Sequence, residues 1–262
     1  MFEQKVIWIT GASSGIGEAL AIESAKRGGR LVLSARNVEK LEELKANLPN
    51  SDAHMVQALD LAKSDDFPQI TKQVVEKMGR IDFLFNNGGI SQRSEVHETT
   101  LDIDRKIMEV NYFGNIALTK SVLPYFREQG SGYFLVVSSI AGKFGFFLRS
   151  AYSASKHALQ GFYESLYLEE EKNGIGVTIA CPGKINTQIS VNALTGDGKQ
   201  HGEMDHNQAT GMSAEECASQ MLKAIEKRQI EVLIGNKEIK AVKLKRFIPG
   251  LFWKVIKKQS AT

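Results

Sequence analysis

The opening stretch of the chain constrains its fold more than any other feature. A run of β-forming residues from Lys5 to Thr10 leads into a glycine turn, Gly11–Gly17, and a helical pattern then continues to Lys26. Glycines let a backbone approach a pyrophosphate, and the start of a helix presents unpaired N–H groups to it. The spacing is G-x-x-x-G-x-G rather than the better-known G-x-G-x-x-G. A plain tight turn would explain an isolated glycine cluster, but the position between strand and helix favours a nucleotide site.

The same alternation of strand and helix continues along the chain. Further strand-like runs are expected at residues 30–35, 54–59, 81–85, 133–137, 175–180 and 231–234, most of them separated by helical patterns. Connections of this length imply parallel strands with right-handed crossovers, so we expect an α/β fold. Ligands of such sheets bind at the carboxyl ends of the strands.

The end of the second expected strand bears on the choice of dinucleotide. Folds that prefer NAD often place an acid there for the ribose 2′-OH, whereas this chain has Arg36. A cation can pair with a 2′-phosphate, so Arg36 predicts NADP(H), although a solvated arginine at a helix start has the same appearance. Asp60 and Leu61 follow the third strand, where they could hold an adenine or simply cap a helix.

Tyr152 and Lys156 form a second candidate site, within a helical pattern that begins at Ser150. Residues four apart lie on one face of a helix, so the phenol and the ammonium become neighbours. A nearby cation favours the phenolate and lowers the pKa of a tyrosine from about 10 toward neutrality. Such a tyrosine could exchange a proton with an alcohol or ketone oxygen. A tyrosine and a lysine with this spacing can also be an ordinary surface pair without a function. A catalytic role therefore needs support from other residues.

Several short motifs together support a catalytic role for Tyr152 and Lys156. They are Thr10-Gly11-x-x-x-Gly15-Ile16-Gly17, Asn86-Asn87, Asn111, Ser139, Tyr152-x-x-x-Lys156 and Pro182-Gly183. In order and spacing they resemble the short-chain dehydrogenase/reductase family, over roughly residues 5–235. The resemblance implies a single-domain, Rossmann-type doubly wound sheet of seven mainly parallel strands, with helices on both faces. One departure is Gly88, where the family usually has alanine, and it removes only a methyl group.

The resemblance also assigns roles to residues. Tyr152 would be the acid/base, Lys156 would lower its pKa and hold the nicotinamide ribose, and Ser139 would bind the substrate oxygen. Asn111 would anchor a water linked to Lys156, although a mid-helix asparagine is more often solvent-facing or packed. The residues implied in coenzyme binding are Gly11, Ser13, Ser14, Gly15, Ile16, Gly17, Arg36, Asp60, Leu61, Asn87, Gly88, Tyr152, Lys156, Pro182, Gly183, Ile185 and Thr187.

The activity implied is NADP(H)-dependent reduction of a ketone or aldehyde, or oxidation of a secondary alcohol, on a small-molecule substrate. The alternative is a non-catalytic dinucleotide-binding sensor or scaffold, which the intact set of catalytic residues disfavours. A homo-dimer or homo-tetramer is expected.

Residues 111–114, 149–152, 190–198 and 249–252 are similar to the dehydrogenase/reductase member 7 branch of the family and its hydroxysteroid dehydrogenase neighbours. Relatives there act on steroid, retinoid or acyl-lipid ketones, which favours an apolar or lipid-like substrate. Four apolar residues between Ser139 and Tyr152 could form the wall of the substrate site: Phe144, Phe146, Phe147 and Leu148. Ordinary packing or an oligomer contact would explain them equally well.

Composition excludes several other classes of protein. Hydrophobic residues make up 42% and charged residues 24% of the chain, as in soluble globular proteins. The first strand begins at Lys5, which leaves no room for a signal peptide, and no apolar run approaches the ~20 residues of a membrane span. Cys181 and Cys217 are too few for a disulfide framework, so a reducing, cytoplasmic location is expected. No metal site is expected, because His201, Glu203, Asp205 and His206 lie in a polar segment without fixed geometry.

Charge separates the chain into two parts. Residues 237–262 contain eight Lys or Arg against one Glu, a net charge of +7, which leaves residues 1–236 at −4. A mildly acidic body argues against nucleic-acid binding. We therefore expect a catalytic domain at residues 1–236, with a mobile substrate lid at about 184–212, and a basic tail at 237–262.

The tail has an amphipathic pattern. In a helical reading of residues 251–258, three lysines occupy one face, and the opposite face holds Leu251, Phe252, Val255 and Ile256. Such a helix fits peripheral contact with an anionic membrane, and it fits docking on the protein body or on a second subunit equally well.

Overall fold

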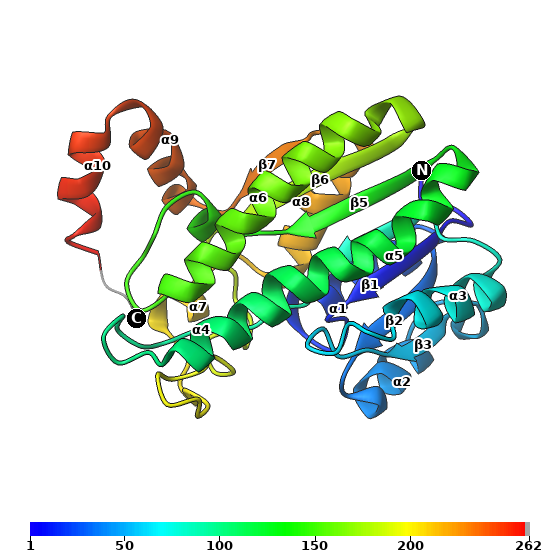
Figure 1. The fold of residues 1–262 in the computed structure, drawn as a ribbon, viewed down its shortest axis with the longest axis horizontal. Helices are drawn as coiled ribbons and strands as arrows, with labels where there is room; N and C mark the ends of the chain where they lie inside the picture. Colours follow the sequence, from blue (N-terminus) through cyan, green and yellow to red (C-terminus); the bar gives the residue numbers. More distant parts are fainter. Residues whose placement is uncertain (260–262) are drawn as a thin grey trace.

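The computed structural model describes residues 1–259 and contains an alternating series of strands and helices (Figure 1). The strands are β1 (Val6–Thr10), β2 (Arg30–Ala35), β3 (Met55–Ala58), β4 (Phe83–Asn86), β5 (Gly132–Val137), β6 (Ile175–Pro182) and β7 (Glu231–Ile234). The helices are α1 (Gly15–Lys26), α2 (Val38–Ala46), α3 (Phe67–Met78), α4 (Leu101–Met108), α5 (Gly114–Gln129), α6 (Ser150–Glu170), α7 (His206–Ala209), α8 (Ala214–Glu226), α9 (Lys240–Phe247) and α10 (Pro249–Ile256).

The strands form one seven-stranded sheet in the order β3-β2-β1-β4-β5-β6-β7. Each of its six strand pairs is parallel, so the expectation of a doubly wound, mainly parallel sheet is confirmed. The direction of winding reverses between β1 and β4, and a crevice at the carboxyl ends of the strands forms at such a point. The glycine turn that follows β1 lies at this edge of the sheet.

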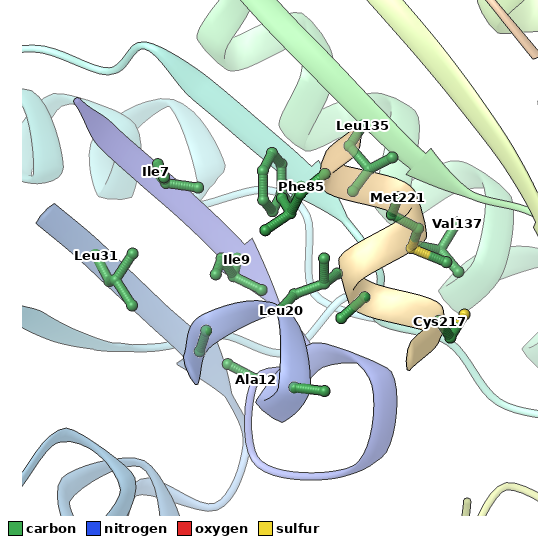
Figure 2. Packing of buried hydrophobic residues seen from close by; sticks show 14 of the residues in the cluster. Ile7, Ile9, Ala12, Leu20, Leu31, Phe85, Leu135, Val137, Cys217 and Met221 are labelled. Carbon is green, nitrogen blue, oxygen red and sulfur yellow. The ribbon is translucent and has the colours of Figure 1, made fainter. Parts of the chain in front are cut away.

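Alternate residues of the strands pack against helices on opposite faces of the sheet. In β1, Ile7 and Ile9 belong to a core shared with α1, α2 and α8 (Figure 2). Val6 and Trp8 point into a second core, shared with α3, α5 and α6. Trp8 is fully buried, and its indole N–H donates to Ser34 Oγ at 2.8 Å. A sheet covered on both faces explains why the strands are nearly continuous apolar runs.

The helix expected over residues 101–127 is interrupted. A π-helical turn, Glu109–Phe113, separates α4 from α5 and contains the buried Asn111. The Asn111 side chain bonds the backbone of Ile90, with Oδ1 accepting from N–H at 2.8 Å and Nδ2 donating to the carbonyl at 2.9 Å. Asn111 is therefore bonded to the backbone of the protein and does not face solvent. π-helical turns are frequent at functional sites.

The polar segment 184–212 is tied to the body by backbone hydrogen bonds. Arg93 N–H donates to the Leu194 carbonyl at 2.8 Å, and Leu194 N–H donates to the Ser91 carbonyl at 2.9 Å. Ser190 and Asp205 of this segment are buried. It is therefore more extensively anchored than its composition indicates, and its opening as a lid stays a prediction.

The tail forms two short helices, α9 and α10, that meet at Ile248. Phe252 is buried against Phe144, with ring centroids 5.2 Å apart, whereas Leu251 is exposed, so the apolar face predicted for residues 251–258 is divided between the protein body and the surface. Residues 260–262 of the predicted tail lie outside the described residues. Within the described part of the chain, no helix is long and apolar enough to cross a membrane.

Candidate active site

The glycine turn after β1 is packed so closely that side chains would not fit. A Cβ on Gly17 would lie 2.1 Å from the Gly11 carbonyl oxygen, and Gly11 itself has a φ of +66°. The side chain of Ser14, the N-cap of α1, makes no capping hydrogen bond. The first N–H groups of α1 are therefore left for another acceptor, and a pyrophosphate fits this position. Ser13, Gly15 and Ile16 belong to the same turn.

The Thr10 hydroxyl joins the ends of β1 and β4. It accepts from the backbone N–H groups of Asn87 (3.0 Å) and Gly88 (2.9 Å) and donates to the Phe85 carbonyl (3.2 Å). Asn87 Nδ2 in turn donates to the Thr10 carbonyl (3.0 Å) and to the Gly11 carbonyl (3.3 Å). Asn87 and Gly88 therefore hold the glycine turn in place.

The residues predicted at the adenosine end lie at the carboxyl ends of β2 and β3. Arg36 is exposed directly after β2, where a cation can meet a 2′-phosphate. Asp60 Oδ1 accepts the N–H of Ala62 at 3.1 Å, and Leu61 is buried beside Gly88. The structure therefore brings all three residues to the edge of the sheet that carries the glycine turn.

Besides Asn87 and Gly88, the residues predicted at the nicotinamide end lie at the end of β6 or follow it. The Pro182 carbonyl accepts from Ser139 Oγ at 3.3 Å, and Gly183 N–H donates to the Ile234 carbonyl at 2.7 Å. Ile185 is buried. Thr187 reaches back over the glycine turn, because its Cγ2 lies 3.1 Å from where a Cβ on Gly15 would be.

Tyr152, Lys156 and Ser139 lie together where α6 meets β5. Lys156 is buried, its ammonium donates to the Val137 carbonyl at 2.8 Å, and it lies 5.7 Å from the centre of the Tyr152 ring. Burial lowers the pKa of Lys156 to about 8. Ser139 accepts the N–H of Ala141 at 3.1 Å, and both Ser139 and Tyr152 line one cavity.

Asn111 also lies close to Lys156. Its Nδ2 also donates to Ser155 Oγ at 3.0 Å, and a Cβ on Gly89 would lie 3.0 Å from Asn111 Oδ1 and 3.6 Å from Lys156 Nζ. The four predicted catalytic residues are therefore brought together, and Gly89 leaves a narrow space between Asn111 and Lys156.

A cavity of about 1210 Å³ opens above Tyr152 and Ser139. It is larger than most pockets for small molecules. Phe144 and Phe146 line it, as predicted for a substrate wall, whereas Phe147 is exposed and Leu148 is not part of the lining. Both tail helices contribute to the cavity, which the sequence did not predict.

Comparison with known proteins identifies the family. A family model described as short chain dehydrogenase matches residues 5–197. This chain belongs to the short-chain dehydrogenase family. A Drosophila melanogaster relative named dehydrogenase/reductase SDR family protein 7-like is 41% identical over 98% of this chain and 80% of its own length. A Mus musculus relative named dehydrogenase/reductase SDR family member 7B is 42% identical over 96% of this chain and 80% of its own length.

Solved structures of the family share the fold. A short-chain dehydrogenase from Streptomyces avermitilis superposes with a TM-score of 0.82 at 28% identity, over 97% of this chain and 96% of that one. An alcohol dehydrogenase from Thermococcus sibiricus, complexed with 5-hydroxy-NADP, superposes with a TM-score of 0.76 at 25% identity, over 90% of this chain and 97% of that one. A Burkholderia phymatum structure in complex with NAD gives 0.83 at 23% identity over 95% of each chain, which shows the fold alone. This dehydrogenase is thus an oxidoreductase of a family whose members act on small molecules and often oligomerise.

The electrostatics of the dehydrogenase site differ from the sequence prediction. Lys156 was expected to lower the pKa of Tyr152, but the pKa of Tyr152 is raised, because burial of the phenol is the largest effect. The polar side chain of Ser139 and the positive charges of Arg93 and Arg149 oppose that rise. Lys156 is not among the groups that move it.

Arg93, Arg149 and Asp205 were not predicted as site residues. The Asp205 carboxylate accepts from Arg93 Nε at 2.9 Å and from Arg149 Nη2 at 2.8 Å, and its Oδ1 lies 3.9 Å from His201 Nε2. Asp205 is therefore occupied by two arginines rather than by a metal. No group of three or more potential metal ligands occurs in residues 1–259.

Gln92 positions the start of α6 and was also missed. Its Oε1 accepts the N–H of Ala151 at 2.9 Å, and its Nε2 donates to Thr99 Oγ1 at 2.7 Å and to Ser150 Oγ at 3.2 Å. The contacts with Ser150 and Ala151 join segments that are 58 and 59 positions apart, so no local motif could have revealed them.

Proposed function

We propose that this chain is an NADP(H)-dependent oxidoreductase that interconverts a ketone or aldehyde with an alcohol, with Tyr152 as the acid/base. One observation carries the proposal: Tyr152 and Ser139 lie together on the wall of the large cavity, with the buried Lys156 beside them. A phenol and a hydroxyl that face one space can both bond a single carbonyl oxygen.

Each of these side chains has a distinct part in the reaction. A bound coenzyme supplies or accepts the hydride. In reduction, Tyr152 donates its proton to the developing alkoxide, and Ser139 donates a hydrogen bond to the same oxygen. The positive charges of Arg93 and Arg149 stabilise the phenolate that remains, and Lys156, with a pKa of about 8, can return a proton to it near neutral pH.

The preference for NADP(H) is supported by Arg36. Its side chain is exposed at the end of β2, and no ion pair within residues 1–259 occupies it. A guanidinium in this position can pair with a 2′-phosphate through two hydrogen bonds.

An apolar, lipid-like substrate is supported by the lining of the cavity. Phe144, Phe146 and Ile189 contribute to it from the body, and Leu244 and Ile256 contribute from the tail helices. Apolar pockets with a few converging polar groups are typical of small-molecule sites.

We also propose a homo-dimer or homo-tetramer in the cytoplasm. Cys181 and Cys217 are both free and buried, which fits a reducing compartment. Sedimentation velocity of the purified protein would test the oligomeric state.

The Tyr152→Phe variant tests the mechanism. We expect NADPH oxidation against a panel of ketones, from small diketones to steroids, to fall by at least about 1000-fold, because the proton donor is lost. NADPH binding, followed by its fluorescence, should stay within about threefold of the wild type. Tyr125→Phe on α5, outside the cavity lining, is the matched control.

Two results would contradict the proposal. A Tyr152→Phe variant with a near-normal rate would remove Tyr152 from the mechanism. A wild-type protein that binds NADPH but turns over no ketone, aldehyde or alcohol of the panel would instead favour a dinucleotide-binding sensor or scaffold.

A further inference from the structure

The two C-terminal helices expose an unusual group of apolar side chains. Of the thirteen large hydrophobic residues that are exposed in residues 1–259, five fall between positions 247 and 255. We call these five residues the tail patch: Phe247, Ile248, Leu251, Trp253 and Val255, each between 41% and 77% exposed. Single exposed apolar residues are ordinary on a protein surface, whereas a contiguous group marks an interaction site.

The tail patch is held outward by contacts on the opposite side of the helices. Phe252 is buried against Phe144, and Lys245 Nζ donates to the Lys143 carbonyl at 2.8 Å. Figure 1 shows α9 and α10 together at one end of the molecule, beyond the carboxyl ends of the central strands. The helices are thus docked on the body, and docking does not cover the patch.

Positive charge surrounds the tail patch. The exposed cations of the two helices and their flanks are Lys237, Lys240, Lys243, Arg246, Lys254, Lys257 and Lys258. Within the part of the chain that the structure describes, none of them forms an ion pair. The single acid, Glu238, accepts the backbone N–H groups of Lys184 (3.0 Å) and Asn236 (3.1 Å) and is directed inward.

We propose that the tail patch docks on the surface of an anionic lipid bilayer. Exposed apolar residues with a tryptophan, flanked by lysines, match the interfacial region of a membrane, where an apolar face inserts about 5–10 Å. Anionic headgroups complement the uncompensated cations. A second copy of this chain fits less well, because a symmetric contact would bring two tails of like charge together.

The tail patch is continuous with the cavity. Phe247, Ile248 and Val255 belong to the patch and also line the cavity above Tyr152. Docking would therefore turn the mouth of the cavity toward the lipid, so that an apolar substrate could enter without crossing water. This consequence depends on the proposed function, whereas membrane docking does not.

Co-sedimentation with vesicles tests the docking. We expect the full chain to bind phosphatidylcholine vesicles that contain 30% phosphatidylglycerol and to bind pure phosphatidylcholine at least tenfold more weakly. The double variant Leu251→Ser/Trp253→Ser should lose at least tenfold in binding to the anionic vesicles. Neither residue lines the cavity, so NADPH binding should be unchanged and confirms that the variant is folded.

Tryptophan fluorescence gives a second measurement. Trp8 is fully buried and Trp253 is half exposed, so a change of emission on vesicle addition reports Trp253. We expect a blue shift, and quenching by brominated lipids, with anionic vesicles only. The matched control is Val96→Ser/Leu168→Ser, which removes two even more exposed apolar residues outside the tail and should bind like the wild type.

Three results would overturn the proposal. They are no binding to either kind of vesicle, equal binding to both kinds, and binding that the double variant in the tail retains. A double variant that loses self-association in sedimentation velocity, without any vesicle binding by the wild type, would assign the patch to a second copy. Because vesicle binding needs no turnover, failure of docking and failure of the proposed catalytic function are distinguishable.

Discussion

At the coenzyme edge of the sheet, close packing of the glycine turn and hydrogen bonds from uncharged side chains to the main chain fix the geometry, whereas around the substrate cavity charged side chains fix it. The Asn87 amide reaches the carbonyls of Thr10 and Gly11, and the glycine turn leaves no room for a Cβ at Gly17. On the cavity side, Asp205 joins Arg93 and Arg149 across 112 and 56 positions of sequence. Both arrangements join segments that are distant in the sequence, since Asn87 lies 77 positions from Thr10 and 76 from Gly11. The first is closely packed and tolerates little change, whereas the second depends on ion pairs.

The difference explains which of the two regions tolerates amino-acid substitutions. Contacts made by backbone and glycine depend on a short motif that must stay intact, while contacts made by side chains can be exchanged one at a time. We therefore expect substitutions at the coenzyme edge to affect binding and stability strongly. Substitutions at the cavity should instead tune the reaction.

The largest effect is expected for Gly17→Ala. Its Cβ would lie 2.1 Å from the Gly11 carbonyl oxygen and 2.5 Å from Asn87 Nδ2, and neither group can move without breaking the turn. We expect the free energy of unfolding to fall by about 3 kcal/mol and NADPH binding to be lost. Denaturant unfolding and NADPH fluorescence measure the two effects.

Gly161→Ala is the matched control for that variant. Gly161 lies inside α6, and a Cβ there would meet no atom within 4 Å. Alanine should raise the free energy of unfolding by about 0.5–1 kcal/mol, because glycine is a poor helix former. Equal destabilisation by both substitutions would show that the coenzyme edge is no less tolerant than an ordinary helix.

A smaller effect is expected for Arg36→Asp, which alters a side chain at the coenzyme edge and leaves the backbone intact. NADPH binding should weaken by about 10- to 100-fold, because a carboxylate repels the 2′-phosphate, while NADH binding should be kept or improved. Titration with both coenzymes measures the ratio. An unchanged preference would exclude Arg36 from coenzyme selection.

The smallest effect is expected for Arg149→Gln on the cavity side. The charge of Arg149 lowers the pKa of Tyr152, so its removal should raise that pKa. Alcohol oxidation requires the phenolate, and its pH–rate profile should therefore move to higher pH. Arg105→Gln on α4, with an exposed guanidinium, should leave the profile in place. A loss of rate without a shift of the profile would indicate a purely structural role for Arg149.

The sequence was sufficient to predict the order of strands and helices, because buried parallel strands are apolar runs bounded by glycine turns. Strand ends differ by one or two residues, as for β4, which was expected from Ile81 and begins at Phe83. The π-helical turn at Asn111 could not be predicted, since one additional residue in a helix scarcely changes the apolar period. Its cause is the bonding of Asn111 to Ile90, which only the folded chain brings near.

The residues of the candidate site also fall into a group that could be predicted from the sequence and a group that could not. Motif residues such as Ser139, Tyr152 and Lys156 were predicted because their spacing is local or typical of the family. Arg93 and Asp205 were not, because their significance arises from one ion pair between distant segments. The tail shows a third case, in which periodicity placed Phe252 on the same face as Leu251, and the aromatic contact with Phe144 decided its burial.

The π-helical turn also sets the register between two helices. Because it accommodates one residue more than an α-helical turn would, α4 and α5 are rotated relative to each other by about 100° compared with a continuous helix. A deletion of one residue between Glu109 and Phe113 would restore regular helix and turn Asn111 away from Ile90. At this point the chain therefore contains one residue more than a regular α-helix needs. Its removal would make the helix regular but would displace Asn111 from the active site.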